Sequence, residues 1–255
     1  MTILNHKILG EGQPLVILHG LFGSLDNWIS AAKHLSESYQ VILVDQRNHG
    51  QSFHSDDFSY DVMAQDLQNL LETIKINNPI LLGHSMGGKT ILKYASKYRE
   101  GFKKMVVVDI APKAYPVHHQ SILNAYNAVD LSKVERRSDA ENQLKPFVKN
   151  MGIRQFLLKN LYRDKSGNFS WKINLPIIEK NIEKVGEGLP SDKISDKPVL
   201  FIRGEKSDYI LDDDVKTFKT LFPNANLVTI KDAGHWIHAE QPKAFLNTVQ
   251  QFLSI

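Results

Sequence analysis

The chain has 255 residues, 42% of them hydrophobic, and its 31 basic and 28 acidic residues leave a net charge of only +3. This length suits one large α/β domain with room for an inserted subdomain, and so small a charge argues against nucleic acid or an anionic membrane as the main partner. The absence of cysteine excludes disulfides, thiolate metal sites and cysteine nucleophiles.

The first twenty residues lack a basic leader followed by a long apolar run. No uninterrupted apolar segment reaches the ~20 residues that a membrane-spanning helix requires. We therefore expect a soluble, cytoplasmic protein without a membrane span.

The first half of the chain alternates predicted strands with helices. Two strand-like runs, residues 2–9 and 14–20, flank a Gly-Glu-Gly turn and are expected to pair with each other. Residues 39–45 and 79–83 are almost wholly apolar, as strands covered on both faces are. Between them, residues 60–74 predict a helix because its apolar residues recur along one face: Met63, Leu67, Leu70, Leu71 and Ile74.

Further strands are predicted at residues 104–110, 198–204 and 226–234, and a closing helix begins near Pro242. Strands alternating with helices favour an α/β fold with a mostly parallel central sheet and helices on both faces.

One segment interrupts this alternation. Residues 112–197 are rich in charge and helical pattern, with 15 basic and 10 acidic residues and no convincing parallel strand. A stretch this long is not a loop in a compact domain. We expect it to be a helical cap (lid) inserted into a core domain of residues 1–111 and 198–255.

The sequence Gly-His-Ser-Met-Gly at residues 83–87 fits the pattern G-x-S-x-G between a predicted strand and a predicted helix. The glycines allow strand and helix to approach closely, and Ser85 at the apex lies beside the free N–H groups that begin a helix. These features predict that Ser85 is a catalytic nucleophile.

A serine nucleophile needs a base. His235 follows a predicted strand, lies on a loop with Gly234, and comes late in the chain, as the order serine, acid, histidine requires. His238 is the one plausible rival, although a structural or pocket-lining role suits it better.

Four motifs in order resemble the α/β-hydrolase superfamily: LHGLFGS at 18–24, DQRNHGQS at 45–52, GHSMGG at 83–88 and GHW at 234–236. The fuller motifs HGLFGS, GHSMGGK, VVVDIAP and GHWIHAE resemble the small esterase branch that includes bacterial YbfF-type esterases and their eukaryotic abhydrolase relatives. The resemblance implies serine ester or thioester hydrolysis under a helical cap, without a cofactor or metal. Serine at position 85 argues against dehalogenase and epoxide hydrolase chemistry, because those members carry aspartate there.

Two carboxylates compete for the acid of the triad. Most superfamily members place it three residues beyond the glycine of the strand that matches 198–204, where this chain has Ser207 and then Asp208. Asp109, after the strand 104–108, reaches the same sheet edge as Ser85 if the strands are parallel. The esterase branch keeps this aspartate, so the resemblance favours Asp109, with Asp208 as the alternative.

The backbone N–H of Met86 and that of Leu21, or alternatively of Phe22, are expected to form the oxyanion hole. In the motif at 45–52, Asp45 and Arg47 are expected to pair and hold a structural turn. Apolar and aromatic residues of the cap and loops are candidates to line the substrate pocket: Phe22, Tyr115, Trp171 and Trp236.

These observations predict a Ser-His-Asp hydrolase that cleaves carboxylic esters or acyl thioesters through an acyl-enzyme, acting as a monomer or small homo-oligomer. The basic excess of the cap makes acyl-coenzyme A thioesters one candidate substrate class. Two alternatives stay open. The same residues can serve a carbon–carbon hydrolase, lactonase, amidase or perhydrolase, and the fold can also carry a non-catalytic binding protein.

Overall fold

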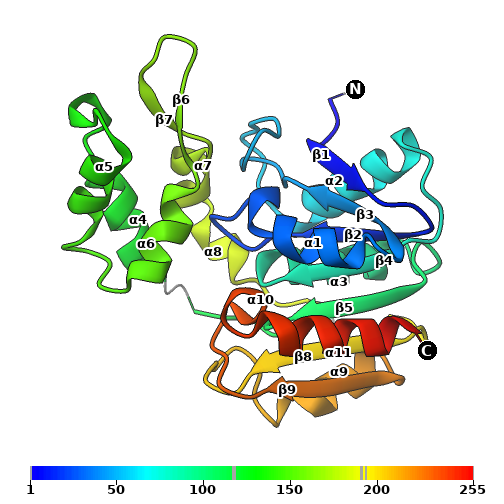
Figure 1. Ribbon diagram of the computed structural model, residues 1–255. Coiled ribbons are helices and arrows are strands. Elements are labelled where there is room, and N and C mark those ends of the chain that lie inside the picture. The colour runs from blue at the N-terminus through cyan, green and yellow to red at the C-terminus, as the bar shows by residue number, and fades with distance from the viewer. Residues whose placement is uncertain (1, 117–118, 190–191, 193, 255) are drawn as a thin grey trace.

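The computed structural model describes residues 2–116, 119–189, 192 and 194–254. Its centre is a seven-stranded sheet in the order β1-β3-β2-β4-β5-β8-β9 (Figure 1). All neighbouring strands are parallel except β1, which runs antiparallel to β3. The strands are β1 (His6–Leu9), β2 (Gln13–Leu18), β3 (Tyr39–Val44), β4 (Ile80–His84), β5 (Lys104–Val108), β8 (Val199–Gly204) and β9 (Ala225–Ile230).

The predicted pairing of the first two strands is wrong, because β3 lies between β1 and β2. The connection passes over the start of β3 with Gly10 and Gly12 at positive φ. A Cβ atom on Gly10 would lie 2.6 Å from the carbonyl oxygen of Tyr39. Glycine is therefore needed at position 10, where the chain crosses another backbone.

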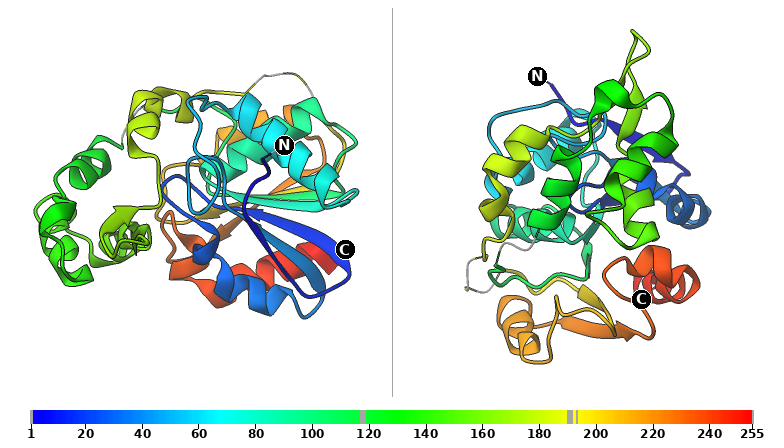
Figure 2. Two further views of the ribbon diagram at one scale, coloured as in Figure 1. Left: turned by 90° about the horizontal axis from the view of Figure 1, so that it is seen from above. Right: turned by 90° about the vertical axis from the view of Figure 1, so that its left-hand side faces the viewer.

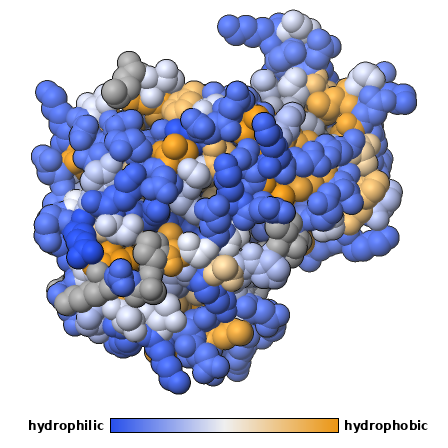
Figure 3. All heavy atoms as spheres, turned by 180° about the vertical axis from the view of Figure 1, so that it is seen from behind, coloured by the Kyte–Doolittle hydropathy of each residue, from blue (hydrophilic) through white to orange (hydrophobic). Residues whose placement is uncertain are grey.

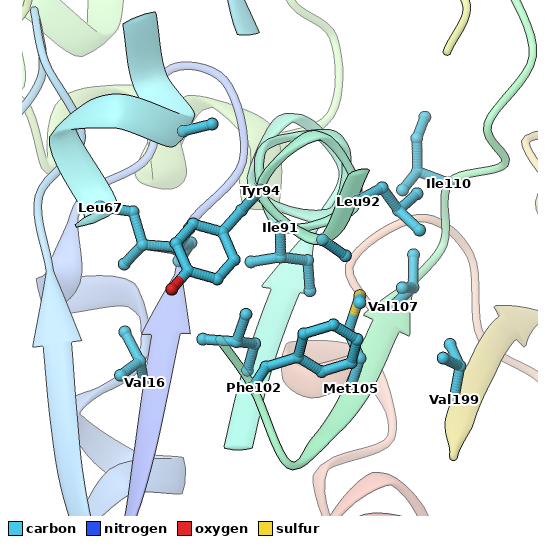
Figure 4. Packing of buried hydrophobic residues seen from close by; sticks show 14 of the residues in the cluster. Val16, Leu67, Ile91, Leu92, Tyr94, Phe102, Met105, Val107, Ile110 and Val199 are labelled. Carbon is cyan, nitrogen blue, oxygen red and sulfur yellow. The ribbon is translucent and has the colours of Figure 1, made fainter. Parts of the chain in front are cut away.

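Helices cover both faces of the sheet, as predicted (Figure 2). One face packs against α1 (Ile29–Leu35) and α11 (Pro242–Ser254), and the other against α2 (Tyr60–Thr73), α3 (Met86–Lys97) and α9 (Asp214–Leu221). Alternate residues of β2 divide between the two faces, so that Leu15 and Ile17 join one apolar cluster and Val16 and Leu18 the other. Figure 4 shows side chains of α3 packed on β5.

The segment of residues 112–197, here called the inserted segment, leaves the sheet after β5 and returns at β8 (Figure 1). Its elements are α4 (Gln120–Asn127), α5 (Arg137–Leu144), α6 (Met151–Leu158), the hairpin β6 (Leu161–Arg163) and β7 (Phe169–Trp171), α7 (Leu175–Lys180) and α8 (Ile182–Val185). The antiparallel hairpin was not expected from the sequence. The segment packs around an apolar cluster that also includes residues outside the segment: Leu21, Phe22, Phe58, Tyr60, Met63 and Met86.

The turn after β3 does not hold together as predicted. Arg47 forms a bidentate pair with Asp66 of α2, at 2.5 and 2.8 Å, instead of pairing with Asp45. Asp45 accepts hydrogen bonds from the backbone N–H groups of Leu25 and Gln51. The turn is thus bonded through Asp45 to the connection after β2 and through Arg47 to α2. A pair between Asp45 and Arg47 would make neither contact.

The surface seen from behind is mostly hydrophilic, with hydrophobic side chains scattered between (Figure 3). Within the described residues, no helix combines the length and apolar character needed to cross a bilayer.

Candidate active site

Ser85 lies at the sharp junction between β4 and α3. Its φ of 52° and ψ of −118° are a strained combination for a residue with a side chain, of a kind that costs about 1–3 kcal/mol. The flanking glycines permit this turn, because a Cβ on Gly83 would lie 2.3 Å from the carbonyl oxygen of Gly87, and one on Gly87 would lie 2.4 Å from that of Leu18. The Ser85 N–H donates to the carbonyl of Val108 at 2.9 Å, which ties the turn to the end of β5.

Two backbone N–H groups beside Ser85 have no acceptor within the described chain: those of Met86 and Leu21. The loop after β2 that carries Leu21 lies against the turn at Ser85, since a Cβ on Gly20 would lie 3.1 Å from Cβ of Ser85. The Phe22 N–H already donates to Nε2 of His49 at 3.2 Å. Of the two candidates for the second donor, Leu21 is therefore the available one.

Asp109 and His235 form a direct pair. Nδ1 of His235 donates to Oδ2 of Asp109 at 2.7 Å, and the Asp109 side chain is fully buried. The carboxylate also accepts from the Gly204 N–H at 3.1 Å and from the Ser207 hydroxyl at 2.5 Å. Three donors to one buried carboxylate fix its orientation.

Asp208 does not take part in this arrangement. It is exposed and makes no hydrogen bond or ion pair with any residue that the structure describes. Ser207, at the position where the resemblance to the superfamily would place the acid, donates to the carboxylate of Asp109. The geometry thus favours Asp109 over Asp208.

The loop that carries His235 is held from several sides. The Glu240 carboxylate, at the end of α10 (Ile237–Glu240), accepts from the Gly234 N–H at 2.7 Å and from the Trp236 N–H at 3.1 Å. The ring of Tyr209 stacks on the imidazole with centroids 4.1 Å apart. These contacts leave 18% of the His235 side chain exposed.

His84 connects the serine turn to the histidine loop. Its Nε2 donates to the backbone carbonyl of His235 at 2.8 Å, and it directly precedes Ser85. Burial holds the pKa of His84 well below its ordinary value, so the ring is neutral. No hydrogen bond joins the Ser85 hydroxyl to His235 within the described chain, and such bonds are often long before substrate binds.

The rival, His238, has a structural environment. Its ring stacks on Trp28 with centroids 4.1 Å apart, the residue is half-buried, and desolvation of the ring lowers its pKa to about 3. A ring held neutral by an apolar stack, without a carboxylate partner, suits packing.

A small cavity of about 20 Å³ lies beside Ser85. Of the four predicted pocket residues, Tyr115 lines it. Phe22 and Trp171 instead pack on Tyr126 inside the cluster of the inserted segment, and Trp236 lines a separate groove of about 460 Å³ between α6 and α10. The cavity is lined by Tyr60, Ser85, Met86, Ile110, Tyr115, Pro116, His119, Ile182, Val185, Gly186 and Tyr209.

Sequence reasoning missed Tyr60, Tyr209 and Ile182 in this lining. Tyr60 begins α2 and Tyr209 follows β8, so only the tertiary fold brings them to the serine. Among the described residues, no group of three or more histidine or acidic side chains is arranged to hold a metal ion.

Comparison with known proteins gives consistent matches. A family model described as alpha/beta hydrolase fold matches residues 13–242. The chain is 40% identical over 253 residues to the zebrafish (Danio rerio) sn-1-specific diacylglycerol lipase ABHD11, covering 96% of this chain and 79% of that protein. It is 36% identical over 247 residues to the Escherichia coli esterase YbfF, covering 96% and 94%. A solved structure titled "Marine microorganism esterase" superposes with a TM-score of 0.96 at 43% identity, covering 99% of this chain and 100% of that one.

Proposed function

The chain belongs to the alpha/beta hydrolase fold family, and on this premise we propose that it is a serine hydrolase that cleaves carboxylic esters or acyl thioesters. Esterase and lipase names among its relatives support ester hydrolysis on small-molecule substrates. The observation that carries the proposal is the hydrogen-bonded pair of buried Asp109 and half-buried His235, next to a strained serine with two N–H groups free to bind an oxyanion.

In the first half-reaction, Ser85 Oγ forms a bond to the acyl carbon while the carbonyl electrons move to oxygen. A carboxylate can only accept, so Nδ1 of His235 carries the proton and Nε2 is free to take the serine proton. The N–H groups of Met86 and Leu21 stabilise the oxyanion. When the intermediate collapses, the bond to the leaving alcohol or thiol breaks, and His235 returns the proton to it.

In the second half-reaction, water replaces the leaving group. His235 takes a proton from water as the oxygen attacks the acyl-enzyme, and the same two N–H groups hold the second oxyanion. Collapse releases the carboxylic acid and returns the proton to Ser85. Asp109 keeps the imidazole in one tautomer throughout and stabilises its charged form.

We assign the inserted segment as a cap over a core of residues 1–111 and 198–255. Most residues of its apolar cluster belong to the segment itself, which supports this division, and so does its supply of Tyr115 and Ile182 to the cavity beside the serine. Its excess of basic over acidic residues supports acyl-coenzyme A thioesters as candidate substrates. If this is right, hydrolysis of acyl-coenzyme A falls with ionic strength while that of neutral p-nitrophenyl esters does not. Equal salt dependence would remove the thioester proposal.

A fluorophosphonate probe tests the nucleophile. We expect covalent labelling of the wild type and of Ser96→Ala, and none of Ser85→Ala. Ser96 is a matched control because it lies on the same helix, with its hydroxyl bonded to the Lys93 carbonyl. Equal labelling of Ser85→Ala would refute the proposal.

A further inference from the structure

Lys89 is a fully buried lysine that the proposed chemistry does not use. It lies one helical turn after Ser85 on α3, and its backbone N–H donates to the Ser85 carbonyl at 3.0 Å. Its ammonium is not within ion-pair distance of any carboxylate in the described chain. A buried cation without an anionic partner calls for another source of stabilisation.

Three backbone carbonyls and two aromatic rings supply it. Nζ donates to the carbonyl of Lys113 at 2.9 Å, to that of Gly186 at 3.3 Å and to that of Glu187. The faces of Tyr115 and Tyr60 lie 4.8 and 5.8 Å from Nζ. An ammonium has three N–H donors and no acceptor, so three carbonyls satisfy it completely.

The charge is present at neutral pH. Burial lowers the pKa of Lys89 to about 8, and the nearby Glu187 opposes this effect. The group is therefore mostly protonated at pH 7 and carries all three donors.

The three carbonyls belong to the two ends of the inserted segment, which run side by side. The Tyr115 N–H donates to the Gly186 carbonyl and the Leu189 N–H to the Pro112 carbonyl, both at 2.8 Å. A Cβ on Gly186 would lie 2.3 Å from the carbonyl oxygen of Tyr115, so the two backbones are in direct contact. We call residues 112–115 and 186–189 the hinge.

The hinge also lines the cavity beside the serine, through Tyr115 and Gly186. Tyr60, under the ammonium, lines the same cavity and donates from its hydroxyl to the Val185 carbonyl at 2.7 Å. The Lys89 side chain thus connects α3, the helix that follows Ser85, to both segments of the hinge and to part of the cavity wall.

We propose that Lys89 is a positioning residue whose ammonium clamps both segments of the hinge to α3 and so sets the shape of the substrate cavity. Without the amine, the carbonyls of Lys113 and Glu187 lose their donor, and that of Gly186 keeps only the Tyr115 N–H. A replacement donor can come only from water, which requires the hinge to separate from α3. The effect on substrate binding rests on the function proposed above, but the clamp itself does not.

Amide hydrogen exchange at Tyr115 and Leu189 tests the clamp without reference to activity. In Lys89→Met we expect both amides to exchange at least tenfold faster than in the wild type. Lys93→Met is the matched control, since Lys93 lies one turn further along the same helix and pairs with Asp61 at 2.9 Å. It should leave both amides unchanged. A folded Lys89→Met protein with wild-type exchange at both amides would overturn the proposal.

Kinetics separates positioning from chemistry. Nζ of Lys89 touches none of the proposed catalytic groups, so for a p-nitrophenyl ester we expect KM to rise at least fivefold and kcat to stay within threefold. A fall in kcat alone would contradict the assigned role. If the wild type hydrolyses no ester, the proposed function fails, while the exchange data still decide the clamp.

Chemical rescue is possible because the chain has no cysteine. Lys89→Cys, alkylated with 2-bromoethylamine while unfolded and then refolded, regains a lysine analogue and should regain slow exchange and low KM. Alkylation with iodoacetamide adds a neutral group and should not.

A second measurement needs no variant. In the wild type, acetylation of Lys89 by acetic anhydride should proceed no faster than exchange at Tyr115 and Leu189, because both need the hinge to open. Acetylation while these amides stay protected would also overturn the proposal.

Discussion

Replacing Asp109 with asparagine tests the assigned acid most directly. Oδ1 of Asp109 accepts from the Gly204 N–H, which is fixed backbone, and Oδ2 accepts from His235. The asparagine amide NH₂ cannot face a backbone N–H without a clash of donors, so it must point at His235. The Ser207 hydroxyl also bonds Oδ2, and it can rotate to accept instead.

The imidazole must then accept at Nδ1 and carry its proton on Nε2. In that tautomer it cannot take the proton of Ser85. A serine protease with the equivalent change loses about 10⁴-fold in kcat, which we expect here too. At 1.36 kcal/mol for each factor of ten, the loss corresponds to about 5.4 kcal/mol of transition-state stabilisation.

The assay is hydrolysis of p-nitrophenyl butyrate, with urea unfolding to verify that each variant is folded. Asp208→Asn serves as the control, and we expect its kcat within threefold of wild type because the side chain is exposed and unpartnered in the described chain. A large loss in Asp208→Asn together with a small loss in Asp109→Asn would refute the reasoning.

Three further predictions concern the scaffold of the site. Glu240→Gln replaces one of two acceptors with a donor facing a backbone N–H, so we expect kcat to fall about tenfold with little change in KM; unchanged kcat in steady-state assays would contradict this. Asp66→Asn leaves Arg47 buried without its anion and should lower the free energy of unfolding in urea by about 3–5 kcal/mol, and a loss below 1 kcal/mol would count against a stabilising pair. The free energy of unfolding should also fall as pH drops from 7 to 5. Burial lowers the pKa of several histidines in the folded protein, so the unfolded chain binds more protons than the folded one at pH 5. This difference lowers the free energy of unfolding by about 2 kcal/mol for each such histidine at pH 5. The histidines concerned are His19, His49, His84 and His238. Urea titrations at several pH values would show no such fall in the free energy of unfolding if these rings were protonated in the folded protein.

Local patterns predicted much of this architecture. The apolar face of residues 60–74 predicts α2, which spans Tyr60–Thr73, and the resemblance to the α/β-hydrolase superfamily is confirmed by the family match. The turn at Ser85 was also predictable from local sequence, because the two glycines that flank it stand between a predicted strand and a predicted helix.

Several contacts between residues far apart in the sequence were not predicted. Arg47 pairs with Asp66 instead of Asp45 because α2 packs back on the turn, and the strand neighbour of β1 is fixed by a crossover. The cavity walls behave similarly. Tyr60 and Tyr209, which are almost 150 residues apart in the sequence, both line the cavity beside Ser85. The local sequence pattern around either tyrosine does not predict that they lie close together.

The backbone of Ser85 has a consequence for how this chain can evolve and be engineered. Glycine at position 85 would adopt the same turn without steric penalty, and would abolish any nucleophile there. A screen for thermal stability alone would therefore favour Ser85→Gly, a variant without the hydroxyl group. Selection must score turnover as well, because the most robust version of this fold and the working version differ by one hydroxymethyl group.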